Sequence, residues 1–164
     1  MPQQIVINSL EFAREGRELS GELPLTAFPR LVENLLDSAG LLSYRLAGKL
    51  GAKGEPLLLL TVHGLLPVQC QRCLERMDSP LDVEALYELR NDVEALTQED
   101  LEDDSRDFLP IERAMDVADL IEDEVLLAIP IAPRHEQCSP PATRQDDGAA
   151  SPFAVLSALG KKPQ

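Results

Sequence analysis

Residues 42–66 read LSYRLAGKLGAKGEPLLLLTVHGLL, two apolar stretches joined by a glycine-rich turn. In the first stretch Leu42, Tyr44 and Leu46 alternate with polar or small residues, which is typical of a strand with one buried face. The second stretch, Pro56–Leu66, is almost continuously apolar and indicates a strand buried on both faces. The turn lacks the spacing of a phosphate-binding loop, so we interpret it as a plain hairpin connection.

More strands are predicted on both sides of this hairpin. Val83, Ala85, Tyr87 and Leu89 alternate with mostly charged residues, and a third strand that follows a short turn predicts an antiparallel meander. The other segments predicted to be short strands or extended arms are residues 5–10, 19–25 and 108–111.

Two segments have the apolar spacing of helices. The first is Phe28–Ala39, which ends at Gly40. The second begins after Asp116, a residue type that caps helix N-termini, and runs to about Ile129. The predicted fold class is therefore α+β, an antiparallel meander or partly closed sheet covered by two helices.

The negative charge is concentrated in one part of the chain. The protein has 164 residues with 15 Lys and Arg against 29 Asp and Glu, a net charge of −14. Residues 92–124 contain 14 acidic and 2 basic residues, so the rest of the chain is nearly neutral. This balance argues against a protein that coats nucleic acid, because phosphates require dense Lys and Arg. Residues 91–107 have few apolar side chains and predict an acidic, mobile loop.

The chain is predicted to form one α+β domain over residues 1–138, followed by a flexible tail over residues 139–164. The tail contains an apolar segment at residues 152–159. This segment either packs back on the domain or docks into a groove of a partner, with Phe153 and Leu156 as its anchors.

The sequence also predicts a cytoplasmic location. Its first residues lack the pattern of a signal peptide, and its longest apolar runs fall far short of the roughly 20 residues that span a bilayer. Three cysteines are an odd number, which suits a reducing compartment.

The strongest local motif is Cys70-Gln71-Arg72-Cys73, which lies between two predicted strands. A hairpin can direct both thiolates to one side, as in zinc knuckles, whereas a redox motif is expected at the start of a helix. His135 and Cys138 have the spacing of a second pair of ligands. The four residues together predict a structural zinc site, with reduced cysteines near a turn as the alternative.

An enzyme is not expected. The chain has two histidines, no nucleophile elbow and no zinc-protease motif. His63, on the predicted buried strand, is interpreted as a histidine packed in the core. The carboxylates are abundant, but they occur in segments predicted to be solvated, where nothing shifts their pKa values toward catalysis.

Three blocks of the sequence resemble one family. They are Cys70–Glu75, then Val117–His135 with Cys138, and finally Pro152–Leu156. In order and spacing they resemble the bacterial YceD family of large ribosomal RNA subunit accumulation proteins, in its proteobacterial branch. The resemblance implies a small non-enzymatic α+β protein that supports the synthesis, processing or stability of 23S ribosomal RNA. Some relatives carry additional cysteines where this chain has only Cys138.

Two modes of action remain open. In the first the protein binds 23S ribosomal RNA or its precursor, a basic ribosomal protein or a processing factor. Its acidic segment would then engage a basic partner. In the second it is an acidic adaptor that contacts only protein and affects ribosomal RNA indirectly. A third alternative is a small zinc-binding or thiol-redox protein. Neither a membrane nor a small-molecule substrate is expected as a partner.

Basic residues near the cysteine motif predict a modest phosphate-contacting patch. Its members are Arg72 and Arg76 on the cysteine hairpin, with Arg45, Lys49 and Lys53 on the neighbouring strand and turn.

Overall fold

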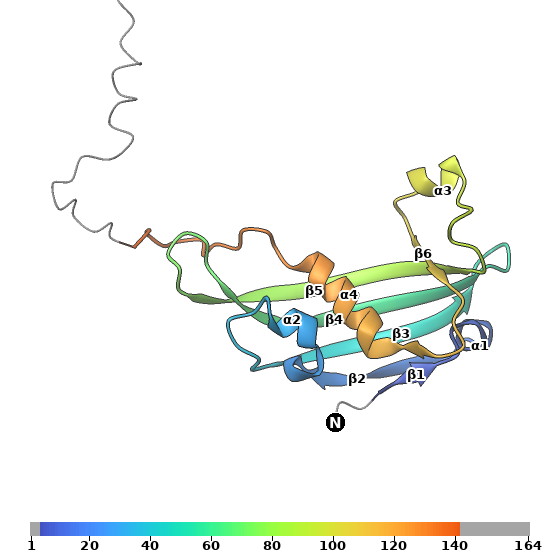
Figure 1. The fold of residues 1–164 in the computed structure, drawn as a ribbon, viewed down its shortest axis with the longest axis horizontal. Helices are drawn as coiled ribbons and strands as arrows, with labels where there is room; N and C mark the ends of the chain where they lie inside the picture. The colour runs from blue at the N-terminus through green and yellow to red at the C-terminus, as the bar shows by residue number, and fades with distance from the viewer. Residues whose placement is uncertain (1–3, 142–164) are drawn as a thin grey trace, which may run out of the picture.

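Five strands form one sheet with the order β2-β3-β4-β5-β6 (Figure 1). The structure is a computed structural model, and it describes residues 4–141. The strands are β2 (Glu18–Pro24), β3 (Leu41–Leu50), β4 (Pro56–Gln69), β5 (Arg76–Arg90) and β6 (Asp107–Pro110). The first four pair antiparallel, which confirms the predicted meander, but β6 pairs parallel to β5. The sheet is therefore mixed and not purely antiparallel as the sequence predicted.

The parallel pairing of β6 follows from the path of the preceding segment. Residues 91–106 leave the end of β5 and return beside it, and they contain the short helix α3 (Gln98–Glu102), capped by Thr97. A parallel neighbour requires a connection of about this length, because a tight turn can only reverse the chain. The segment predicted as an acidic, mobile loop therefore contains a short helix.

Side chains of one face of the sheet form the core. The register aligns Tyr44 with Val62 and Val62 with Val83 across three strands, and all three are buried. The opposite face is more open, since Leu65 on β4 is 55% exposed. The prediction of a strand buried on both faces is therefore wrong for this half of β4. His63 is likewise exposed and lies 3.0 Å from Asp82, so it is not a core residue.

Within residues 4–141, three helices contribute side chains to the core of the sheet, one more than the sequence predicted; their arrangement can be followed in Figure 1. They are α1 (Ser9–Arg14), α2 (Pro29–Val32, after a 3-10 turn at Leu25–Ala27) and α4 (Val117–Ala128). The prediction of helix α4 is confirmed. Its predicted cap is confirmed as well, because the Asp116 side chain accepts a hydrogen bond from the Ala118 N–H. Helix α1 takes up residues 9 and 10 of the segment 5–10, which was predicted as a short strand or extended arm. Of that segment only β1 (Val6–Ile7) is a strand, and it pairs with β7 (Met115–Asp116).

Helix α2 is much shorter than the predicted Phe28–Ala39. After Val32 the backbone tightens into turns, and the Leu36 N–H donates to the Pro67 carbonyl oxygen on β4 at 2.8 Å. This bond to the sheet replaces the helical bond that Leu36 would make to Val32. Residues 33–36 therefore run along the end of β4 as an irregular segment.

Candidate metal centre

The candidate centre lies where the β4–β5 hairpin meets the chain that leaves α4. Residues 70–75 close the hairpin, with the Cys70 N–H donating to Glu75 and the Leu74 N–H donating to Cys70. Leu74 has a positive φ of 65°, an uncommon conformation for a leucine that tightens this turn. The Gln71 N–H donates to the Pro133 carbonyl at 2.8 Å, and this bond fixes the segment after α4 against the hairpin.

The structure brings together all four predicted ligands. The ligand atoms of Cys70, Cys73, His135 and Cys138 all lie within 4.8 Å of one another. The Cys70 and Cys138 sulfurs are 3.7 Å apart, and the Cys73 sulfur is 3.3 Å from His135 Nδ1. In a tetrahedral site with Zn–S bonds of about 2.3 Å, two sulfurs are about 3.8 Å apart. Both the donor set and the spacing therefore fit a tetrahedral zinc ion.

Backbone groups surround the most buried thiol. Burial alone raises the pKa of Cys70, but N–H groups of Cys73, His135 and Arg72 outweigh it and lower the pKa to about 5. The Cys73 pKa is raised, because burial and the nearby Cys70 and Cys138 sulfurs outweigh the effect of the Glu75 N–H. Thiolates this close repel one another, and a cation among them would remove that repulsion.

Arg72 completes the cluster and was not predicted to do so. Its Nε donates to the Cys138 sulfur at 3.0 Å, and its Nη2 donates to the His135 carbonyl at 2.8 Å. Three thiolates and one Zn²⁺ carry a net charge of −1, which one guanidinium neutralises. Arg72 was predicted to contact phosphate, but in the structure it is occupied by the cysteine cluster. The spacing of the Cys-x-x-Cys motif does not indicate that the arginine inside it will donate hydrogen bonds to the cluster.

The other predicted contact residues do not form one patch. Arg76 is paired with Asp37 and Asp78 at 3.3 and 2.9 Å. Lys49 lies opposite Leu57 at one end of β4, whereas Arg76 lies opposite Gln69 at the other. These positions are twelve residues apart along the strand, which corresponds to about 40 Å.

The predicted single patch is therefore wrong, because the hairpin turns lie at opposite ends of the sheet (Figure 1). Lys53, in the β3–β4 turn, belongs to the far end with Lys49, and Arg45 on β3 is paired with Glu18 at 2.7 Å. The predicted anchors Phe153 and Leu156 lie outside the described residues.

Several acidic residues of the 92–124 segment also have cationic partners within the protein. Arg90 donates to both carboxylate oxygens of Asp100 at 2.9 Å, and Arg106 pairs with Asp103 and Glu88. These arginines hold helix α3 against β5. The negative surface is therefore less concentrated than the sequence suggested, although Asp92, Glu94 and other acidic side chains remain exposed.

Fold and cluster together define a small α+β protein with a mixed sheet and a Cys/His group at one corner. The chain belongs to the family described as large ribosomal RNA subunit accumulation protein YceD, whose sequence profile matches residues 58–159. This confirms the resemblance noted above, and the matched range contains all four residues of the cluster. No curated protein and no solved structure matches the chain. Among the described residues, no helix is long and apolar enough to cross a membrane.

Proposed function

We propose that this protein is a non-enzymatic, cytoplasmic ribosome-biogenesis factor that supports the synthesis, processing or stability of 23S ribosomal RNA by binding. The observation that carries this proposal is the family match over residues 58–159, because the family is named for accumulation of the large ribosomal RNA subunit. The reducing cytoplasm suits three free cysteines. A Cys₃His set offers a metal four protein ligands and no open position, which suits a structural role better than a catalytic one.

The surface chemistry favours a basic protein partner over RNA as the first contact. Arg30, Arg45 and Arg76 each pair with carboxylates of the protein itself, so they are poorly placed to bind phosphate. Lys49 and Lys53 are exposed at the far end of the sheet, and two lysines supply only weak, salt-sensitive attraction. Exposed acidic residues between 92 and 119 would attract a basic ribosomal protein or processing factor.

Binding to labelled 23S ribosomal RNA fragments would separate the two kinds of partner. If RNA is contacted directly, affinity falls between 50 and 200 mM salt, and the Lys49→Ala/Lys53→Ala chain shows a shallower salt dependence. A matched Lys49→Arg/Lys53→Arg chain keeps the charges and should bind like the wild type. If no binding occurs at 50 mM salt, direct RNA contact is excluded.

A second experiment tests the protein partner. The chain with Asp92→Asn and Glu94→Gln should capture less of the basic ribosomal proteins from a ribosome-depleted extract than the wild type captures. An unchanged capture would exclude this acidic surface as the contact.

We also propose that Cys70, Cys73, His135 and Cys138 hold one zinc ion. The 3.7 Å separation of the Cys70 and Cys138 sulfurs supports this assignment, together with Arg72 as the balancing charge. The ion would tie the hairpin to the segment after α4, two parts of the chain more than sixty residues apart.

Metal analysis of protein purified without chelator should find close to one zinc per chain. Cys73→Ser should lose it, while Ser79→Ala, a small change on the neighbouring strand, should keep it. A folded wild type free of metal would contradict the zinc site without affecting the binding proposal.

A further inference from the structure

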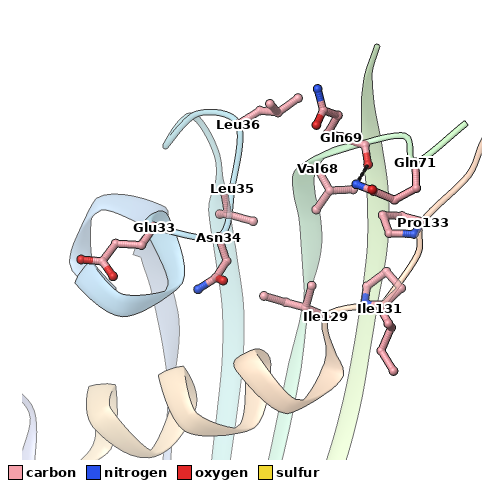
Figure 2. Close-up of a pocket in the computed structure, with 11 residues that line it drawn as sticks. Glu33, Asn34, Leu35, Leu36, Val68, Gln69, Gln71, Ile129, Ile131 and Pro133 are labelled. Atoms are coloured by element: carbon pink, nitrogen blue, oxygen red, sulfur yellow. Dashed lines mark hydrogen bonds between the residues drawn. The ribbon is translucent and has the colours of Figure 1, made fainter. Parts of the chain in front are cut away.

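A groove lined by both apolar and polar side chains lies beside the Cys/His cluster (Figure 2). Its volume is about 310 Å³. One wall is the irregular segment after α2, the floor is the end of β4, and the other wall is the chain that follows α4. We call it the corner groove, and its apolar lining residues include Leu35, Leu36, Val68, Ile129, Ile131 and Pro133.

Two apolar side chains of the corner groove are exposed to solvent. Leu36 is 47% exposed and Ile131 is fully exposed. In Figure 2 the side chains of Leu35, Val68 and Ile129 converge on the same space. An apolar segment that docked here would cover these side chains.

The chain itself supplies an occupant of matching chemistry. Residues 152–159 read PFAVLSAL, are uncharged, and are followed by Gly160-Lys161-Lys162. Phe153 and Leu156 are three positions apart, a spacing that places two side chains on one side of a helical turn. Glu33, at the rim of the groove, is the only charged residue that lines it among the described residues, and it complements the lysines.

The connection is also long enough. Ten residues separate Pro141, the last described residue, from Pro152, and a chain of ten residues can span up to about 35 Å. As a random coil it would span about 17 Å on average. Pro133 lines the rim of the groove, and Pro141 follows it by eight residues. A tethered segment has an effective concentration in the millimolar range, which favours it over a free partner.

We propose that residues 152–159 dock in the corner groove of their own chain, with Phe153 and Leu156 as the anchors. The tail then covers the exposed Leu36 and Ile131 side chains. Any partner that uses this corner of the protein must first displace the tail. This inference does not depend on the proposed function in ribosomal RNA accumulation.

Hydrogen exchange of the full-length chain tests the proposal. We expect amides of residues 152–159 to exchange at least tenfold more slowly than those of residues 142–150. Ile131→Asp, in the groove wall, should abolish this protection. Leu127→Asp is the matched control, because Leu127 is 82% exposed on α4 and does not line the groove. Exchange of residues 152–159 at the rate of a free peptide in the wild type would overturn the proposal, as would protection that survives Ile131→Asp.

A peptide of residues 150–161 provides the second measurement. It should bind the Leu156→Asp full-length chain, whose own tail is disabled, at least tenfold more tightly than it binds the wild type. Ser157→Asp, which leaves both anchors intact, should behave like the wild type. Equal binding to all three chains would overturn docking within one chain. Protection that appears only at concentrations where light scattering detects dimers would overturn it too, and would assign the groove to the tail of a second copy.

Discussion

The buried carboxylate of Glu122 is expected to hold the wall of the corner groove in place. Glu122 lies on α4 and is 2% exposed. One of its oxygens accepts a hydrogen bond from the Leu31 N–H at 3.0 Å, and the other accepts from Arg30 Nε at 2.8 Å. Both partners belong to α2, which precedes the irregular segment at residues 33–36. The four-residue helix α2 is too short to be stable by itself.

The cost of removing this carboxylate can be estimated from the structure. Glu122→Ala leaves the buried Leu31 N–H without an acceptor, which costs about 2 kcal/mol, and loses a buried methylene worth about 0.8 kcal/mol. The expected loss of folding free energy is therefore about 3 kcal/mol. Glu122→Gln restores an acceptor and the side-chain volume, so it should cost less than half as much.

Urea unfolding at pH 7, followed by circular dichroism at fixed zinc concentration, measures this loss. With a slope of about 2 kcal/mol per molar urea, Glu122→Ala should lower the midpoint by about 1.5 M. Asp123→Asn is the control, since Asp123 also pairs with Arg30 but is exposed to solvent, and it should leave the midpoint unchanged. A midpoint for Glu122→Ala within 0.3 M of the wild type would refute the assignment of Glu122 as the anchor of α2.

Three further predictions follow from other contacts. Hydrogen bonds from Arg90 hold the pKa of Asp100 well below its usual range, so this carboxylate stabilises the fold above about pH 4 and the stability is lost as the pH falls further. Asp100→Asn should therefore lose less stability than the wild type between pH 6 and pH 3 in urea unfolding, and equal losses would contradict this. Burial and then the Glu124 carboxylate, 2.6 Å away, raise the pKa of Tyr87, so its contribution is complete below about pH 10 and is lost as the pH rises. Absorbance should show ionisation of Tyr87 only with alkaline unfolding, and reversible ionisation near pH 10 in the folded state would contradict this. Gly48→Ala would push a methyl carbon into the Phe12 carbonyl oxygen of α1 and should cost about 2 kcal/mol in thermal unfolding; an unchanged midpoint would show that α1 moves away freely.

The sequence predicts those parts of the fold that are determined by local periodicity. Strand β5 and most of β3 bury one face, so their apolar residues alternate visibly. Helix α4 has an apolar stripe and the Asp116 cap, which together mark its start and its length. The four Cys and His residues were also predicted as one group, because thiol and imidazole side chains at ligand spacing carry a strong chemical signal.

Features that depend on tertiary contacts were missed. Phe28–Ala39 has helical spacing, but the hydrogen bond from Leu36 to Pro67 on β4 competes successfully with the helix. The position of β6 beside β5 depends on the path of residues 91–106 between the two strands, which no local pattern specifies. His63 is flanked by apolar residues in the sequence, yet the register places it on the open face beside Asp82.

The role of Arg72 shows a similar limit at the candidate site. An arginine in a Cys-x-x-Cys turn can contact either a phosphate or a sulfur. Which of the two it contacts depends on the position of the segment after α4. That segment brings Cys138 and the His135 carbonyl to the guanidinium.

The cluster and the corner groove are parts of one corner and should respond to each other. Gln71 and Pro133 both line the groove, and the hydrogen bond between them joins the cysteine hairpin to the segment that carries His135 and Cys138. An ion bound by the cluster would hold these two segments together from one side, and the docked tail would hold the groove walls together from the other. Loss of the ion would free Pro133 and Ile131 to move away from the hairpin and would weaken the tail's site. Zinc content and tail docking are therefore expected to be thermodynamically linked, with each strengthening the other.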